Sequence, residues 1–209
     1  MSILLQPGFF GPIIQYVAMA AHSELVFEKE DNFQKQTYRN RCYIYGANGR
    51  QLLSVPIRHS KSDGRQKTKD VKIDNSFPWQ RNFIRSLEAS YRSSPYFEFY
   101  EDELMVVLNK RHKYLLDLNL EAHHVIGECL QLDNKVQFTN EYDLNPEGIN
   151  DLRFLVEAKK ERTYNFDPYI QVFSSKYGFL PNLSILDLLF NEGTNALGYL
   201  EQHKNLLDL

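Results

Sequence analysis

The segment KQTYRNRCYI, residues 35–44, concentrates side chains that bind anions and sugars. Its polar and aromatic members with that chemistry are Lys35, Tyr38, Arg39, Asn40 and Arg41. A guanidinium group forms paired hydrogen bonds to a phosphate or carboxylate, and a tyrosine ring stacks on a sugar or a base. The segment therefore predicts a pocket for a phosphorylated or nucleotide-linked substrate.

An internal ion pair is the alternative explanation of the same arginines. Glu28, Glu30 and Asp31 lie a few residues upstream, and any of them could neutralise one arginine while the other stays in water. In a regular strand, Arg39 and Arg41 would share a face and repel each other unless an anion or a carboxylate lies between them. We expect an external anion, in which case lysine at either position weakens ligand binding and leaves folding intact.

Two strands have to bring these side chains to one place. Residues 2–7 and 24–29 are apolar runs typical of buried strands, and residues 13–21 read as a helix that starts after Gly11-Pro12. Strand, helix and strand within about thirty residues form a βαβ unit with parallel strands. Ligands bind at the carboxyl ends of such strands. The side chains expected at this edge are Gln6, Lys29, Asn32, Lys35, Gln36, Arg39 and Arg41.

A hairpin and a helical half follow along the chain. Residues 41–45 and 50–57 bracket Asn48-Gly49, a pair that favours a tight hairpin turn, and residues 71–73 are a further strand candidate beside them. Other strand patterns cover 135–139 and 169–173, and helical patterns cover 75–94, 101–130 as two helices, 182–193 and 194–206.

The fold class that these patterns predict is α/β, in one domain over residues 1–209. The βαβ unit and the hairpin are expected in one mixed sheet, followed by a helical C-terminal half. Within the first long helix, Trp79, Phe83, Leu87 and Tyr91 fall four apart, so their face should be buried against the sheet. The cationic segment 58–70 is expected to be a solvated loop, with a lid over an anion as the alternative.

Composition excludes several classes of partner. The formal net charge of −3 gives no general attraction to nucleic acid or to an anionic membrane. No apolar stretch approaches the roughly 20 residues of a membrane span. Cys42 and Cys129 make no disulfide framework, so a reduced, cytoplasmic protein is expected. Nothing in the sequence indicates a cofactor or an oligomeric state.

Sequence motifs for known chemistries are absent. The chain has no Walker phosphate loop, no G-x-G-x-x-G, no Asp-x-Asp metal pair and no G-x-S-x-G elbow. His124 and Glu128 are one helical turn apart, but a surface hydrogen bond explains them better than a metal, and no metal is predicted. Cys42 is expected to be a small core residue rather than a nucleophile.

Four segments resemble the WbqC-like protein family. LQPGFFGPIIQYVAMAAHSELVF resembles its opening, with Leu5 where members often have histidine and Gly11-Pro12 where they usually have Pro-Trp. FQKQTYRNRCYIYGANGRQLLSVPI resembles its Arg-Asn-Arg hairpin, and PWQRNFIRSLEASYRSSPYF its tryptophan helix. FLPNLSILDLLFNEG resembles the closing helix of a branch found in Bacteroidetes-type bacteria.

The resemblance implies a role in making O-antigen and other surface polysaccharides, with transfer of an amino acid such as glycine to a sugar. The chain would then be a transferase for a phosphate- or nucleotide-linked sugar. Arg39 and Arg41 would hold the anion with Lys35, Gln6 and Asn40 would orient the acceptor, and Tyr38 or Tyr96 would stack on the sugar. The alternatives are a non-catalytic binding or scaffold protein of that pathway, because no acid, base or nucleophile stands out, and an unrelated metabolic enzyme that shares only the fold.

Overall fold

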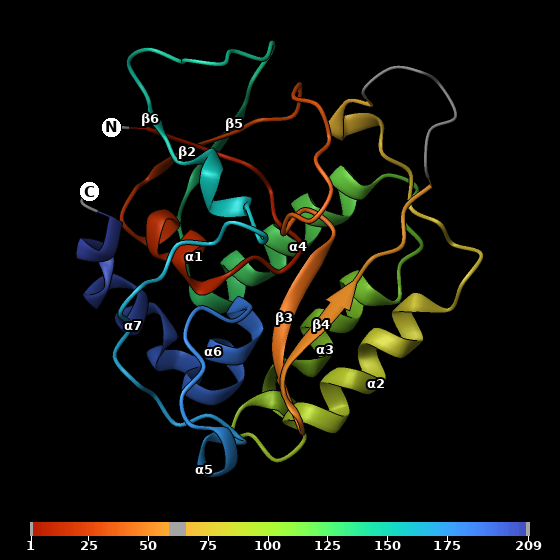
Figure 1. The fold of residues 1–209 in the computed structure, drawn as a ribbon, viewed down its shortest axis with the longest axis vertical. Coiled ribbons are helices and arrows are strands. Elements are labelled where there is room, and N and C mark those ends of the chain that lie inside the picture. The colour runs from red at the N-terminus through yellow and green to blue at the C-terminus, as the bar shows by residue number, and fades with distance from the viewer. Residues whose placement is uncertain (1, 59–65, 208–209) are drawn as a thin grey trace.

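Residues 3–27 form the predicted βαβ unit. The computed structural model describes residues 2–58 and 66–207. In it β1 (Ile3–Leu5) and β2 (Glu24–Phe27) are parallel neighbours joined by α1 (Ile13–Ala20). β5 (Lys135–Phe138) and β6 (Asn150–Asp151) add to the two sides, so the sheet order is β5-β2-β1-β6 with every pair parallel. All four carboxyl ends therefore meet at one edge (Figure 1).

The hairpin forms a separate sheet, and the prediction of one mixed sheet is wrong in this respect. β3 (Arg41–Gly46) and β4 (Gly49–Ser54) pair only with each other among the described residues. On the outer edge of β3, the carbonyl of Tyr43 accepts a hydrogen bond from the N–H of Ser184 at 2.7 Å, and β1 already has neighbours on both sides. Both sides of β1 and the outer edge of β3 are therefore already occupied.

Three long helices cover the hairpin side of the molecule: α2 (Trp79–Tyr91), α3 (Phe97–Leu108) and α4 (Leu115–Leu130). Trp79, Phe83, Leu87 and Tyr91 are all buried, which confirms the predicted apolar face of α2. This face packs against the hairpin, as Figure 1 shows in yellow and orange. The helical stretch between residues 101 and 130 is two helices, as predicted.

The C-terminal half is helical, and this part of the fold class is confirmed. It contains α5 (Ser174–Tyr177), α6 (Ile185–Glu192) and α7 (Ala196–Gln202), with 3-10 turns at Gly193–Asn195 and Lys204–Leu207. α6 and α7 pack on α1, which explains why α1 is buried on every side. Ser184 caps α6 by accepting a hydrogen bond from Leu186 N–H.

Two strand predictions fail. Residues 169–171 have no regular secondary structure and residues 172–173 form a turn. Tyr169 and Gln171 direct their side chains to Asp187, while Ile170 is 83% exposed. Residues 71–73 contribute only two isolated bridges, between Ile73 and Ile57 and between Lys72 and Tyr114. Conversely, the strand β6 forms in a segment whose sequence indicates a loop.

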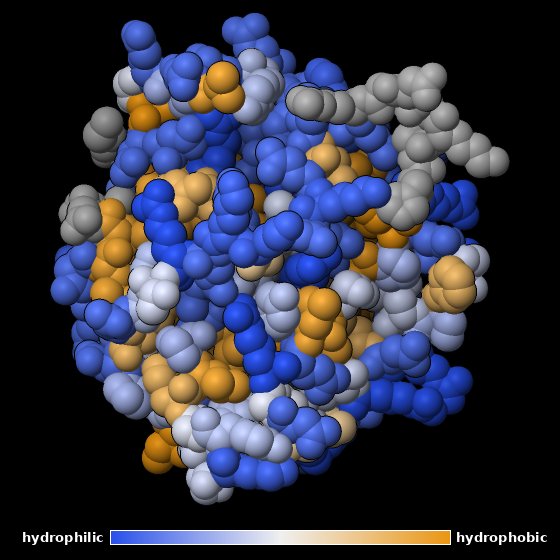
Figure 2. Space-filling view, viewed as in Figure 1, coloured by the Kyte–Doolittle hydropathy of each residue, from blue (hydrophilic) through white to orange (hydrophobic). Residues whose placement is uncertain are grey.

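The described surface shows no membrane-spanning element. None of the helices within residues 2–58 and 66–207 is long and apolar enough to cross a bilayer. Figure 2 shows a largely hydrophilic face on which hydrophobic residues occur in separate small groups.

Candidate functional site

A polar cavity of about 190 Å³ lies at the carboxyl edge of the parallel sheet. Its wall includes Gln6, Asp31, Arg39, Tyr142, Asp151 and Arg153. Gln6 directly follows β1, Asp31 follows β2, Tyr142 follows β5 and Asp151 ends β6. The cavity is therefore assembled by the four strand ends rather than by one local motif.

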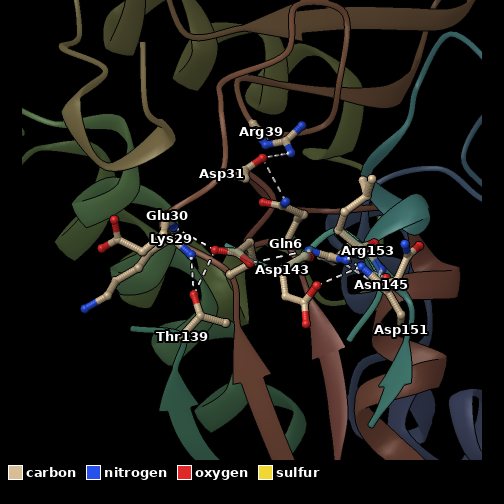
Figure 3. Close-up of polar contacts among 12 residues, drawn as sticks. Gln6, Lys29, Glu30, Asp31, Arg39, Thr139, Asp143, Asn145, Asp151 and Arg153 are labelled. Carbon is tan, nitrogen blue, oxygen red and sulfur yellow. Dashed lines mark hydrogen bonds and ion pairs between the residues drawn. The ribbon is translucent and has the colours of Figure 1, made fainter. Parts of the chain in front are cut away.

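Asp31, which follows β2, is hydrogen-bonded both to Gln6 after β1 and to Arg39. Its Oδ2 accepts hydrogen bonds from Arg39 Nη2 at 2.7 Å and from Gln6 Nε2 at 2.9 Å, as Figure 3 shows. The side chains of Arg39 and Asp31 are only 3% and 4% exposed. Burial lowers the pKa of the Arg39 guanidinium, and the Asp31 carboxylate opposes this effect. The internal carboxylate that the sequence left as an alternative is thus Asp31.

The cluster has unused hydrogen-bonding capacity. Arg39 Nε and Nη1, Asp31 Oδ1 and Gln6 Oε1 are shielded from solvent and have no hydrogen-bond partner among the described residues. An unpaired buried polar group typically costs about 1–3 kcal/mol. Two unpaired donors and two unpaired acceptors at one cavity fit a ligand that both accepts and donates hydrogen bonds.

Asp187 shows what a purely structural buried carboxylate looks like in this protein. Its Oδ1 accepts from Tyr91 Oη at 2.7 Å, and its Oδ2 accepts from Tyr169 Oη and from Gln171 Nε2. Both of its oxygens are used, whereas Oδ1 of Asp31 is not. The unpaired atoms at the cavity are therefore a local property of that site.

Arg153 forms the opposite wall, and its donors are occupied. It makes a fork with Asp151, from Nε to Oδ1 at 2.9 Å and from Nη2 to Oδ2 at 2.7 Å. Nη1 donates to the carbonyl of Asp143 at 2.7 Å and lies 3.4 Å from Oε2 of the fully buried Glu28. Arg153 thereby ties the end of β2 to β6 and to the segment after β5.

These ion pairs change the titration of both partners. The hydrogen bonds to Asp151 raise the pKa of Arg153. Burial alone would raise the pKa of Asp151, but the hydrogen bonds from Arg153 outweigh it and lower that pKa. Both groups are charged at neutral pH, so the positive charge of Arg153 and the negative charge of Asp151 cancel within the wall.

Asn119 of α4 fixes the two loops that carry Gln6 and Arg39. Its buried Nδ2 donates to the carbonyl of Pro7 at 3.0 Å and to the carbonyl of Arg39 at 2.8 Å. Gln15 of α1 adds a hydrogen bond from Nε2 to the carbonyl of Gln6. The backbone of the site is therefore anchored from both helices that flank it.

Of the predicted site residues, Gln6 and Arg39 meet at this cavity, and the others lie outside its wall. Tyr38 is buried toward the hairpin, where its hydroxyl donates to Glu161 and accepts from Arg50. Asn40 Nδ2 donates to the carbonyl of Val55 at 3.0 Å. Both side chains serve the packing of the hairpin.

The remaining three predicted residues are also placed elsewhere. Lys35 is exposed. Tyr96 precedes α3 and packs so closely on Gly193 that a Cβ there would lie 2.5 Å from its ring. Arg41 opens β3, whereas Arg39 lies in the preceding turn, so the alternation of a regular strand does not place them on one face.

The described part of the basic segment is held by Glu30. Lys67 Nζ and Lys69 Nζ lie 2.7 and 2.6 Å from its carboxylate oxygens, and these hydrogen bonds lower the pKa of Glu30 to about 2. Most of the predicted lid, residues 59–65, lies outside the described residues.

The described residues contain no group of three or more His, Cys, Asp or Glu side chains that could hold a metal ion. His124 and Glu128 form an exposed pair at 3.6 Å. Cys42 is buried in the core, as predicted, and burial raises the pKa of its thiol above the usual range.

The sequence indicates that the region of Asp143 and Asp151 could hold a carboxylate acid or base, but it singles out neither residue. It gives no signal for Arg153 as a site residue, and it places Glu28 and Asp31 only as ion-pair partners. The Asp-x-Arg spacing was visible, but it lies next to a two-residue strand in a polar segment. Only the parallel pairing of β6 with β1 brings it to the cavity.

The fold and the cavity define an α/β protein with a polar pocket at the carboxyl edge of a parallel sheet. The sequence model of the WbqC-like protein family matches residues 6–169, and the chain belongs to this family. It is also similar to the "Uncharacterized protein Rv1507c" of Mycobacterium tuberculosis, with 27% identity over 203 residues that cover 85% of this chain and 87% of the relative. That name assigns no activity to the relative. No solved structure matches the chain.

Proposed function

We propose that the protein is a cytoplasmic transferase that acts on a phosphate- or nucleotide-linked sugar in surface polysaccharide biosynthesis, with an amino acid such as glycine as a group it transfers. The observation that carries the proposal is the set of unpaired atoms on Gln6, Asp31 and Arg39 at one cavity. Membership of the WbqC-like family supports the pathway, because the resemblance implies surface polysaccharide synthesis.

A sugar hydroxyl matches the unpaired atoms. It accepts a hydrogen bond from an N–H of Arg39 and donates one to Asp31 Oδ1 or Gln6 Oε1. At about 190 Å³ the cavity is smaller than the roughly 300–1,000 Å³ of pockets for drug-sized ligands, so it takes one ring-sized part of a substrate. Because the four atoms are shielded, binding has to move a side chain of the wall, such as the exposed Gln34.

The local charge decides which part of the substrate enters. The wall carries the carboxylates of Asp31, Asp151 and Glu157 against the guanidinium groups of Arg39 and Arg153. A dianionic phosphate is disfavoured beside this excess of negative charge. We therefore assign the cavity to the sugar ring or to an acceptor amine, and place the phosphate outside it.

Asp31 and Arg39 supply the chemistry of such a transfer. Asp31 Oδ1 takes the proton from the attacking hydroxyl or amine as the general base. The nucleophile attacks the carbonyl carbon of an activated aminoacyl donor, and Arg39 stabilises the negative charge that develops on the carbonyl oxygen. The activating group of the donor then leaves with the electron pair of its bond to that carbon as the new ester or amide forms. Arg39 lies 2.7 Å from Asp31 Oδ2, so the two groups are held together at the cavity.

A non-catalytic binding protein of the same pathway is the second candidate. The observation that favours it is the engagement of Asp31 Oδ2 by both Arg39 and Gln6, an arrangement that also suits static binding. Both candidates bind the same sugar moiety, so only product formation separates them.

Thermal shift with sugar nucleotides tests the proposed site. For the native protein we expect the melting temperature to rise by about 5–10 °C at a hundredfold excess over the dissociation constant. Asp31→Asn should abolish the response, because an amide replaces the free carboxylate oxygen. The control Lys35→Ala, which removes an exposed side chain outside the cavity, should retain it.

An equal shift in Asp31→Asn and in the native protein would place the ligand elsewhere and contradict the site. Mass spectrometry of the same mixtures, supplied with activated esters of glycine and other amino acids, then detects transfer; binding without any product would favour the non-catalytic candidate.

A further inference from the structure

A second cavity, of about 330 Å³, lies between α4 and the edge strand β5. It shares no lining residue with the polar cavity described above. Leu120, Leu132, Val136 and Phe138 form most of its apolar wall. β5 is exposed along its whole length, so the cavity opens to solvent.

Two polar side chains in this wall have unused atoms. Asn134 Oδ1 and His123 Nδ1 are shielded and have no hydrogen-bond partner within the described ranges. The orientation of the Asn134 amide is defined, because its Nδ2 donates to the carbonyls of Met19 at 3.0 Å and His22 at 2.6 Å. The unused atom is therefore an acceptor, and it calls for a ligand N–H or O–H.

His123 is uncharged at neutral pH, since burial lowers its pKa to about 4, with a smaller contribution from the charge of His124. Its ring stands edge-on to Phe27 at 4.9 Å, and Phe27 lies 6.5 Å from Phe138. Of these three rings, those of His123 and Phe138 line the cavity, and the buried Phe27 supports them from behind. Flat aromatic walls suit a flat aromatic ligand.

Gly127 keeps the cavity open. It is a buried residue of α4, yet a Cβ built on it would meet no atom within 4 Å. A side chain at this position would therefore extend into free space, which is the cavity that Gly127 lines.

We propose that this cavity is a second ligand site, which takes a flat, uncharged nitrogen heterocycle of the nucleobase kind. The heterocycle packs against Phe138, donates an N–H to Asn134 Oδ1 and pairs with His123 Nδ1 through a ring nitrogen or N–H. The half-exposed Phe138 ring has to move slightly to open the way to these two shielded atoms. The site goes beyond the proposed transferase function and does not depend on it.

A nuclear magnetic resonance titration tests the site. The histidine ring signals of the full chain are followed at pH 7 while adenosine or uridine is added, and His123 is assigned through the His123→Gln variant. We expect a saturable shift of the His123 signal with at least one nucleoside. His124, the exposed neighbour on the same helix, should move much less.

Gly127→Leu fills the cavity and should weaken nucleoside binding at least tenfold. Gly198→Leu is the matched control, because it adds the same side chain to a helix at another glycine with free space around it. Phe138→Ala, on the exposed edge strand, should also weaken binding at least tenfold, which keeps the test decisive if Gly127→Leu does not fold. The absence of any His123 shift with either nucleoside, or unchanged affinity in a folded Gly127→Leu variant, would overturn the proposal.

Discussion

Replacement of Arg39 by methionine is expected to lower the free energy of unfolding by about 3–5 kcal/mol. The substitution keeps most of the side-chain volume but removes the positive charge from a nearly solvent-free site. The Asp31 carboxylate is then left buried without its counter-charge, while Gln6 remains its single side-chain donor among the residues that the structure describes. A urea titration followed by circular dichroism measures the loss.

A double-mutant cycle shows whether the loss belongs to the pair. Asp31→Asn alone leaves a buried guanidinium group without a carboxylate, so it should destabilise as well. Combined with Arg39→Met it removes both charges, and the double variant should lose clearly less stability than the sum of the single variants. Strict additivity, or a loss below about 1 kcal/mol for Arg39→Met, would contradict the buried ion pair.

The cycle also separates stability from function. A double variant that keeps much of its stability but no longer responds to sugar nucleotides would show that the ion pair serves ligand binding. In contrast, a stable double variant with full ligand response would exclude Arg39 and Asp31 from the site. The original expectation, that lysine at position 39 leaves folding intact, is replaced by this test because Arg39 has an internal carboxylate partner.

Replacement of Trp79 by alanine is the second large expected effect, a loss of about 3–5 kcal/mol. Trp79 begins α2, is buried, and has its ring centroid 6.1 Å from that of Phe9 in the loop after β1. Its removal leaves a cavity between the long helix and this loop. Trp79 is the only tryptophan of the chain, so circular dichroism rather than fluorescence has to follow unfolding.

Phe77→Ala is the matched control for Trp79→Ala. It removes another aromatic ring two residues earlier, but Phe77 is 63% exposed, so the loss should stay within about 0.5 kcal/mol. A loss below about 1 kcal/mol for Trp79→Ala would show that the α2 face contributes little to the core. Since Phe9 lies three residues after Gln6, a disturbed core here should also weaken the sugar-nucleotide response.

The elements that could be predicted are those encoded by neighbouring residues. The βαβ unit follows from two short apolar runs and a Gly11-Pro12 helix start. The buried face of α2 follows from the spacing of four aromatic and aliphatic residues. The βαβ unit defines the carboxyl edge of the two strands. The sequence could therefore predict that Gln6 and Arg39 lie near this edge.

The hairpin is an element that the local sequence predicts only in part. Its position was predicted, but its turn comprises Ala47 and Asn48, and the positive φ of 93° falls on Gly49 at the start of β4. The sheet it would join could not be predicted, because edge pairing depends on which strands are already flanked. Here Ser184, from the far end of the chain, bonds to the outer edge of β3.

The sequence by itself determined the family, the α/β class and the presence of Gln6 and Arg39 at one strand edge, because each rests on motifs or periodicities within a few tens of residues. Only the tertiary structure selected Asp31 from three nearby carboxylates as the partner of Arg39. The tertiary structure also places Arg39 in a turn and Arg41 at the start of β3, so the two arginines do not share a site. It brings Asp151 and Arg153 to the cavity through the two-residue strand β6. The physical reason is that the tertiary arrangement of the strands decides which groups meet. β6 pairs with β1 and Arg153 contacts Glu28 across more than a hundred residues, and no local period records such a contact.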